Sequence, residues 1–237
     1  GVPERPLIGT IIKPSVGLSA EATGALVADL CAGGIDFIKD DELQADGPAC
    51  PFEDRVKSTM RAVNAAADKT GKKAMVAFNL TGEIDEMRRR HDLVRDCGGT
   101  CVMVNLTGVG MSGMIDIGRH TELPIHAHRA GWGALTRDPL LGWSYPAWSK
   151  LWRLAGADHM HVNGFDNKFT ESNESVAASV ASLNDPLFGN SPMCAVPVFS
   201  SGQTVRQAAA TLNAAGSPYV LVTAGGGIMA HPDGVTE

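Results

Sequence analysis

In the segment Asp36-Phe-Ile-Lys-Asp-Asp-Glu42, one base and three acids, residues 39–42, follow a short apolar run. Successive side chains of a strand point to opposite sides, so Lys39 and Asp41 share a side, and Glu42 follows where the chain can turn inward. Two convergent carboxylates suit a hard cation such as Mg²⁺. An ammonium repels a cation, but carbamylation by CO₂ would make Lys39 an anionic oxygen ligand. Lys39 could also be a charge partner of the acids, and a solvated charged run explains this segment equally well.

Two His-x-His pairs form the second chemical signal: His126-Ala-His128, followed by Arg129, and His159-Met-His161. In a strand, both imidazoles of each pair project to one side. A zinc site is one interpretation. Proton transfer and phosphate contact beside the acidic segment are another. A single inward histidine is more often an ordinary core residue, but four of them at strand ends favour function.

Two short polar loops could hold a phosphate. Thr223-Ala-Gly-Gly-Gly227 and Ser200-Ser-Gly202 both follow apolar runs, and glycines let backbone N–H groups approach an anion closely. Either loop alone could be a plain turn. As neighbours they match the place where phosphate sites of barrels are commonly built.

These groups must be positioned by eight short β-like runs that alternate with seven helix-like segments, a pattern typical of a parallel sheet with helical crossovers. The expected strands are Leu7–Ile12, Phe37–Lys39, Ala74–Asn79, Cys101–Asn105, Ile125–His128, His159–Val162, Val196–Phe199 and Tyr219–Thr223. The expected helices are Ala20–Gly33, Phe52–Thr70, Ile84–Cys97, Met111–Arg119, Tyr145–Ala155, Ser172–Leu183 and Val205–Ala215. Eight units predict one TIM (β/α)8 barrel over residues 1–237. Its active site should lie where the strands end.

Composition excludes several classes of protein. The chain has 237 residues, 44% of them hydrophobic, which suffices for a real core. A net charge of −6 argues against a nucleic-acid binder. The sequence contains no apolar stretch of about 18 residues, so we expect no membrane span. The chain has five irregularly spaced cysteines, so we expect no disulfide framework. Free thiols are typical of a reducing compartment, which predicts a cytoplasmic protein.

The pattern begins and ends abruptly. The first expected strand starts within ten residues of Gly1, and only about a dozen residues follow the eighth, too few for another helix and a tail. We therefore expect the last helix to be missing and the chain to be part of a longer protein.

Six motifs in this order resemble the large-subunit family of ribulose-bisphosphate carboxylase, in particular its RuBisCO-like proteins. They are Gly9-Thr-Ile-Ile-Lys13-Pro14, Gly34-Ile-Asp-Phe-Ile-Lys39-Asp-Asp-Glu42, His126-Ala-His-Arg129-Ala, Gly156-Ala-Asp-His159-Met-His161, Ser200-Ser-Gly202 and Gly225-Gly-Gly-Ile-Met-Ala-His231-Pro. The resemblance covers essentially the whole chain. It implies that the active site is completed by an N-terminal α+β domain of a second subunit, a domain this sequence lacks, and hence a homodimer or dimer-based oligomer.

The resemblance also implies roles for individual residues. Carbamylated Lys39 would join Asp41 and Glu42 on Mg²⁺. Lys13 would transfer a proton at the enolised carbon, and His128 would be a second acid or base. A phosphorylated substrate would be held by Arg129, His161, Ser200, Gly202, Gly225 and Gly226. Lys168 matches the mobile-loop lysine that stabilises the carboxylated transition state in true carboxylases.

The departures from the family pattern fall on groups that handle CO₂ and bisphosphate. Ser15 stands where carboxylases have a second lysine, and the loop Asn167-Lys-Phe-Thr-Glu171 keeps only its lysine. The serine loop continues with Gln203-Thr204 where carboxylases have Ile-His, and Ile11 replaces a threonine. The groups implied in metal binding and enolisation are retained.

We therefore expect Mg²⁺-dependent enolisation or decarboxylation, through an enediolate, of a phosphorylated keto-sugar or sugar acid. A 3-oxo-isoapionate-4-phosphate-type substrate is favoured. The alternatives are an authentic ribulose-bisphosphate carboxylase, an enolase or isomerase of the methionine-salvage type, and a non-catalytic barrel scaffold. Neither nucleic acid nor a membrane is an expected partner.

Overall fold

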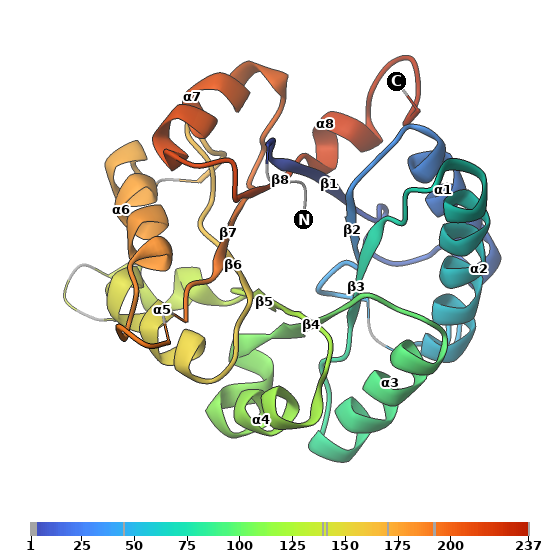
Figure 1. Ribbon diagram of the computed structural model, residues 1–237, viewed down its shortest axis with the longest axis horizontal. Helices are drawn as coiled ribbons and strands as arrows, with labels where there is room; N and C mark the ends of the chain where they lie inside the picture. The colour runs from blue at the N-terminus through green and yellow to red at the C-terminus, as the bar shows by residue number, and fades with distance from the viewer. Residues whose placement is uncertain are drawn as a thin grey trace.

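The computed structural model describes residues 4–44, 46–138, 140, 142–169, 171–191 and 193–236. Eight parallel strands close into a barrel in chain order, and helices surround it (Figure 1). The strands are β1 Leu7–Ile11, β2 Phe37–Lys39, β3 Met75–Asn79, β4 Cys101–Asn105, β5 Ile125–His128, β6 His159–His161, β7 Val196–Phe199 and β8 Leu221–Thr223. The predicted TIM barrel is confirmed.

Closure of the barrel is set by the pairing of its first and last strands. Gly9 of β1 pairs with Phe37 of β2 on one side and with Thr223 of β8 on the other. A Cβ atom at Gly9 would lie 2.9 Å from the Phe37 carbonyl oxygen, so only glycine fits there. The barrel can close because β1 has no side chain at this position.

Helices with clear end signals cover the strands. They are α1 Ala20–Ala32, α2 Phe52–Thr70, α3 Ile84–Asp96, α4 Leu106–His120, α5 Tyr145–Leu154, α6 Asn173–Asn184, α7 Val205–Ala215 and α8 Gly225–Met229, with a 3-10 helix at Trp132–Leu135. Ser19 caps α1 by accepting a hydrogen bond from the N–H of Ala22, as its residue type predicts. Thr204 and Gln207 form a capping box at the start of α7. No helix of the described part is both long and apolar enough to span a membrane.

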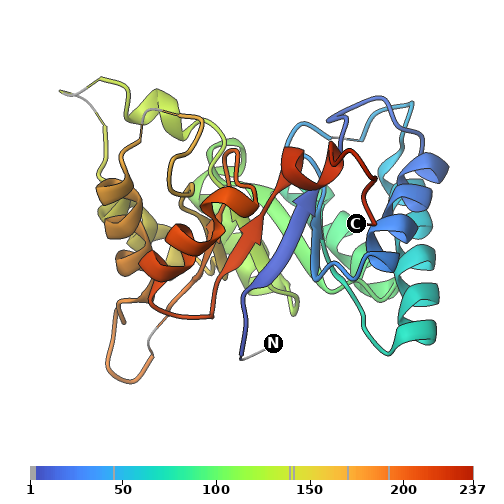
Figure 2. The same cartoon turned by 90° about the horizontal axis from the view of Figure 1, so that it is seen from above.

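Two predictions about helices are wrong. A short helix, α8, does follow β8, and Figure 2 shows it beside the end of β1, opposite the N-terminus of the chain. Its three leading glycines are poor helix formers and hid it in the sequence. Helix α4 begins at Leu106 rather than Met111, because a first turn joins the rest across Gly110, whose φ is 65°.

The core has two parts. The larger lies between strands and helices, and a smaller cluster fills the barrel interior. The interior cluster is Phe37, Ala77, Cys101, Met103, Val198 and Leu221. The rings of His126 and His159 contact Phe37 of this cluster, with centroids 5.0 and 6.1 Å away. The barrel interior is therefore filled by apolar side chains together with histidine rings.

Candidate active site

Two lysines and two acids meet where β1 and β2 end. Nζ of Lys13 lies 2.5 Å from Oδ2 of Asp41, and Nζ of Lys39 lies 2.9 Å from Oε2 of Glu42. Lys39 is 1% exposed, whereas the side chain of Lys13 is 44% exposed. The structure thus brings together the four residues to which the family resemblance assigns metal binding and proton transfer.

Asp40 does not belong to this group, as the strand period predicts. Its carboxylate accepts hydrogen bonds from Nε of Arg55 in α2, at 3.2 Å, and from the N–H of Asn79, at 3.1 Å. Both it and Arg55 are buried. Asp40 therefore ties β2 to α2 and β3, while its neighbours on either side face the site.

Asn79, the last residue of β3, supports the acidic loop, which is residues 40–44 after β2. Its amide nitrogen donates to the carbonyl oxygens of Asp41, Glu42 and Gln44 at 3.4, 3.3 and 3.2 Å. Its carbonyl oxygen accepts from the N–H of Thr81 at 3.2 Å. This buried side chain thus fixes the backbone that carries both carboxylates.

Burial sets the charge state of Lys39. Complete burial lowers the pKa of its amine, although Glu42, Asp41 and Asp40 act in the opposite direction. Burial alone would raise the pKa of Glu42, but the Lys39 ammonium outweighs burial, and the pKa lies below its usual range. The site therefore favours an ionised Glu42 and eases deprotonation of Lys39, and a neutral amine is the form that reacts with CO₂.

His128 extends this group across the barrel mouth. Nδ1 of His128 accepts a hydrogen bond from the N–H of Ala130 at 3.1 Å, and Nε2 lies 3.5 Å from Oε2 of Glu42. Burial, with help from the charges of Lys39 and Arg129, lowers the pKa of His128 well below its usual value. The ring is then neutral and carries its hydrogen on Nε2, facing Glu42.

The other histidines form a buried column that ends at the serine loop. Nε2 of His126 lies 2.8 Å from Nε2 of His161, and Nδ1 of His161 lies 3.1 Å from Oγ of Ser200. The rings of His126 and His159 contact edge to face, with centroids 5.7 Å apart. No three donor atoms of these four histidines and nearby acids converge as a metal site within the described residues. The geometry therefore supports the proton-transfer and phosphate interpretation rather than zinc.

Arg129 lies at the edge of this column as a candidate anion-binding group. It is 8% exposed, its guanidinium stacks over Tyr145 at 5.2 Å, and Nη2 donates to Oε2 of Glu171 at 3.2 Å. Nη1 is buried and has no hydrogen-bond partner among the described residues. A buried, unpaired N–H of a cation is a ready donor for an anionic substrate group.

The loops after β7 and β8 lie against each other. Gly202, at φ 90°, precedes Gln203, whose carbonyl oxygen would be 3.1 Å from a Cβ on Gly227. Gly225 and Gly226 were expected in an open loop, but they begin α8. The backbone after β7 thus lies close to the backbone of α8, where the sequence predicts phosphate contacts.

Lys168 lies at the rim. Its backbone N–H donates to the carbonyl oxygen of Ser201 at 3.0 Å, while the exposed ammonium lies 5.3 Å from the ring centroid of Phe169. No contact joins its side chain to Lys13, Lys39 or His128 among the described residues. Thr170 of the same loop lies outside the described residues.

Sequence reasoning missed three residues that support the site. Glu171 and Asn163 bond to each other and connect Arg129 to the hydroxyl of Ser201. Gln203, interpreted only as a departure from the family, is buried and donates to the carbonyl oxygen of Phe165. Long-range partners such as Arg129 and Glu171 leave no local signal.

Residues 2–237 match the family described as ribulose bisphosphate carboxylase large chain, catalytic domain. The sequence is 63% identical over 235 residues to 3-oxo-isoapionate-4-phosphate transcarboxylase/hydrolase of Xanthobacter autotrophicus, covering 99% of this chain and 57% of that protein. It is 41% identical over 236 residues to 3-oxo-isoapionate-4-phosphate decarboxylase of Rhizobium etli, covering 99% and 56%.

The same similarity holds for solved structures. A crystal structure of a rubisco-like protein from Burkholderia fungorum superposes with a TM-score of 0.96 and 46% sequence identity, covering 99% of this chain and 58% of that one. The chain therefore spans a little over half the length of these relatives.

Proposed function

The chain belongs to the family of the ribulose bisphosphate carboxylase large chain, and we propose that it is the catalytic barrel of a decarboxylase. The substrate would be a phosphorylated 3-oxo sugar acid of the 3-oxo-isoapionate-4-phosphate type. Two relatives named for that substrate support the choice. The observation that carries the proposal is the ion-paired group of Lys13, Lys39, Asp41 and Glu42 beside His128.

The residues present fit a magnesium ion and a lysine carbamate. Asp41 and Glu42 offer carboxylate oxygens, and burial favours the neutral, CO₂-reactive amine of Lys39 next to them. Lys39, Asp41 and Glu42 would hold the ion, which when bound supplies positive charge that stabilises an oxyanion.

In the proposed reaction the protein must protonate the carbon from which CO₂ has left. In a 3-oxo acid the bond to the carboxyl carbon breaks, CO₂ leaves, and the electron pair passes into the adjacent carbonyl as an enediolate. In this proposal Lys13, which is half exposed and held by Asp41 and Ser15, protonates the carbon. His128, neutral with a hydrogen on Nε2, would exchange a proton with a substrate oxygen.

The phosphate would be held on the other side of the mouth. In this proposal Arg129 and Ser200 donate from side chains, His161 acts through its hydrogen bond to Ser200, and Gly202, Gly225 and Gly226 donate from backbone N–H groups. The unpaired Nη1 of Arg129 and the close packing of the two glycine loops support this assignment. Lys168 would reach the site only if its loop moved inward. We further propose a homodimer or dimer-based oligomer, as the family implies.

Transfer of the carboxyl group to an acceptor, instead of its release, is a second candidate. The word transcarboxylase in the name of the 63% identical relative favours it. Both reactions begin with the same bond cleavage and need the same residues.

Substrate labelled with ¹³C in its carboxyl group separates these outcomes by NMR, in buffer with Mg²⁺ and bicarbonate. Label in CO₂ and bicarbonate supports decarboxylation, and label in a new organic acid supports transfer. Unchanged substrate, or ordinary incorporation of labelled CO₂ into ribulose bisphosphate, overturns the proposal. Lys39→Ala should abolish turnover and Mg²⁺ binding, whereas Lys57→Ala should change neither, since Lys57 is an exposed α2 residue that pairs with Glu53.

A further inference from the structure

A second group of potential metal ligands lies outside the active site, between α3 and α4. Nδ1 of His91 and Nε2 of His120 each lie 3.0 Å from the same oxygen, Oδ1 of Asp92. All three donor atoms lie within 4.8 Å of one another, and no other such set occurs among the described residues. The two imidazole rings contact edge to face, with centroids 5.0 Å apart.

We propose that His91, Asp92 and His120 bind a divalent transition-metal ion of the zinc class, which cross-links α3 to α4. Zinc–nitrogen and zinc–oxygen bonds of about 2.0–2.1 Å in a tetrahedron place neighbouring donors about 3.3 Å apart. Two donor separations of 3.0 Å need only a small opening to reach that value. Two imidazoles and one carboxylate suit zinc, nickel or copper better than magnesium.

The burial of the cluster supports a preorganised site with one open position. The side chain of His91 is 1% exposed, so its ring is fixed, whereas those of His120 and Asp92 are 31% and 41% exposed. Hydrogen bonding from His91 lowers the pKa of Asp92, which therefore presents a charged carboxylate at neutral pH. Three protein ligands leave a fourth position, which solvent can reach.

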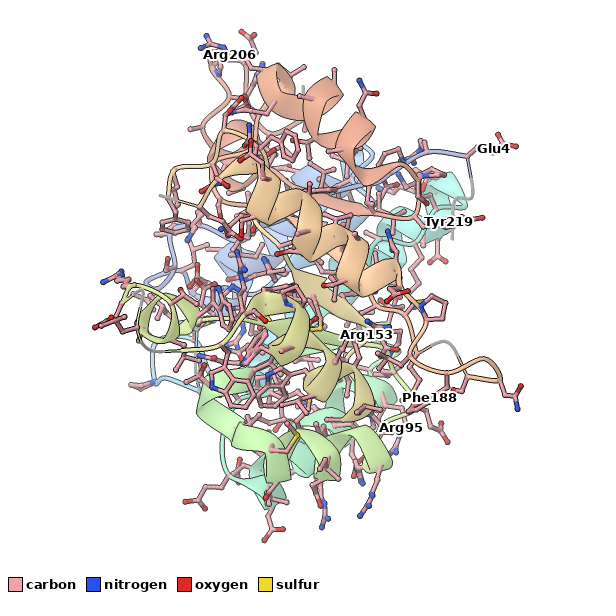
Figure 3. All side chains as sticks on the ribbon, turned by 90° about the vertical axis from the view of Figure 1, so that its left-hand side faces the viewer. Glu4, Arg95, Arg153, Phe188, Arg206 and Tyr219 are labelled. Carbon is pink, nitrogen blue, oxygen red and sulfur yellow. The ribbon has the colours of Figure 1, made fainter. Side chains whose placement is uncertain are left out.

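The site lies away from the proposed catalytic centre. His91 is in the second half of α3 and His120 is the last residue of α4, and helices of a barrel end where its strands begin. Figure 3 shows Arg95, one turn beyond His91, on the same side as Glu4 and Tyr219 and opposite Arg206. The ion would thus act on structure rather than on the proposed reaction.

Arg95 and the second ring nitrogen of His91 limit the affinity of the site for a metal ion. Nη1 of Arg95 donates to the same Asp92 oxygen at 3.1 Å, but its other nitrogens bond to Asp96, so this arginine can release Asp92 and stay paired. Nε2 of His91 is buried without a hydrogen-bond partner among the described residues. Because ligating histidines usually donate this N–H to an acceptor, we expect weaker binding than at a closed four-ligand zinc site.

The test is titration of the protein with Co²⁺ and Zn²⁺, with excess Mg²⁺ to occupy the proposed catalytic site. We expect one ion per chain at this site, visible as the ligand-field absorption of Co²⁺ and as heat with Zn²⁺. Asp92→Asn and His120→Ala should each weaken binding at least about tenfold. Arg95→Ala should tighten it, because it removes the competing cation. His231→Ala removes an exposed histidine elsewhere and should change nothing.

A stability readout keeps the test independent of spectroscopy. Zn²⁺ at one hundred times its dissociation constant should raise the melting temperature by about 5–10 °C, and EDTA should reverse this. The proposal is overturned if the wild type takes up no ion beyond the Asp92→Asn and His120→Ala variants. It is also overturned if Arg95→Ala binds no more tightly than the wild type, since the three residues would then form only a hydrogen-bonded cluster.

Discussion

Replacing Asn79 by alanine should weaken metal binding without removing any metal ligand. The amide of Asn79 donates to three carbonyl oxygens of the loop that carries Asp41 and Glu42. Alanine removes all three hydrogen bonds and the acceptor for the N–H of Thr81. The acidic loop would then keep its sequence but lose the support that fixes its backbone.

The size of the effect follows from these contacts. Donor–acceptor distances of 3.2–3.4 Å are at the long end of the range, and Glu42 and Gln44 are only half-buried, so water can replace the bonds to their carbonyls. Counting the buried Asp41 carbonyl and the Thr81 N–H gives a loss of about 1–2 kcal/mol in the free energy of unfolding. For a chain of this length, that is about 2–8 °C in melting temperature. Support of this kind is worth about 10–100-fold in metal affinity.

Calorimetric titration with Mg²⁺ and bicarbonate, together with thermal unfolding, measures both quantities. Asn105→Ala is the matched control: Asn105 ends β4 as Asn79 ends β3, but its Oδ1 has no hydrogen-bond partner among the described residues. The reasoning is refuted if Asn79→Ala binds Mg²⁺ as tightly as the wild type, or if Asn105→Ala loses as much affinity.

Three further predictions concern catalysis, pH and backbone strain. Lys13→Met should lower kcat about 10²–10⁴-fold in steady-state kinetics, since it removes the proposed proton donor; undiminished turnover would assign the proton to another group. Burial lowers the pKa of His159 to about 4, so between about pH 6.5 and 4 only the unfolded chain takes up its proton. Urea titrations should show stability falling by about 3 kcal/mol for this group as pH falls through that window, with a shallower slope in His159→Gln; equal slopes would contradict it. Gly202→Ala should cost about 1–2 kcal/mol, because φ there is 90°, and should raise KM for the phosphorylated substrate; an unchanged KM would separate this loop from the phosphate.

The parts of the fold that depend on local period and strand order were predictable. Alternation along β2 predicted that Lys39 and Asp41 face the site, and Asp40 indeed turns to Arg55. Convergence of the strand ends follows from barrel closure, so Lys13 and Asp41, 28 residues apart, could be expected to meet.

Features that depend on tertiary contact could not be predicted. Helix α8 has a glycine-rich start with low helix propensity, and its packing against the Gln203 backbone is invisible locally. Asn79 was expected only as the last residue of a strand, because its three acceptors lie 35 to 38 residues away. Likewise Lys168 keeps its place in the sequence motif, but its exposed ammonium lies over Phe169.

The 2.8 Å separation of the two Nε2 atoms of His126 and His161 requires one shared hydrogen. Nδ1 of His126 is buried without a partner among the described residues, so a hydrogen there would cost about 1–3 kcal/mol, and the tautomer protonated on Nε2 is favoured. His161 then accepts at Nε2 and donates from Nδ1 to Ser200. The Ser200 hydroxyl hydrogen is thereby left to donate to another acceptor, and Oγ of Ser201 lies 3.4 Å away. The tautomer of a buried ring two residues removed along this chain of contacts thus makes Ser200 a donor, which is the role that the proposed phosphate site asks of it.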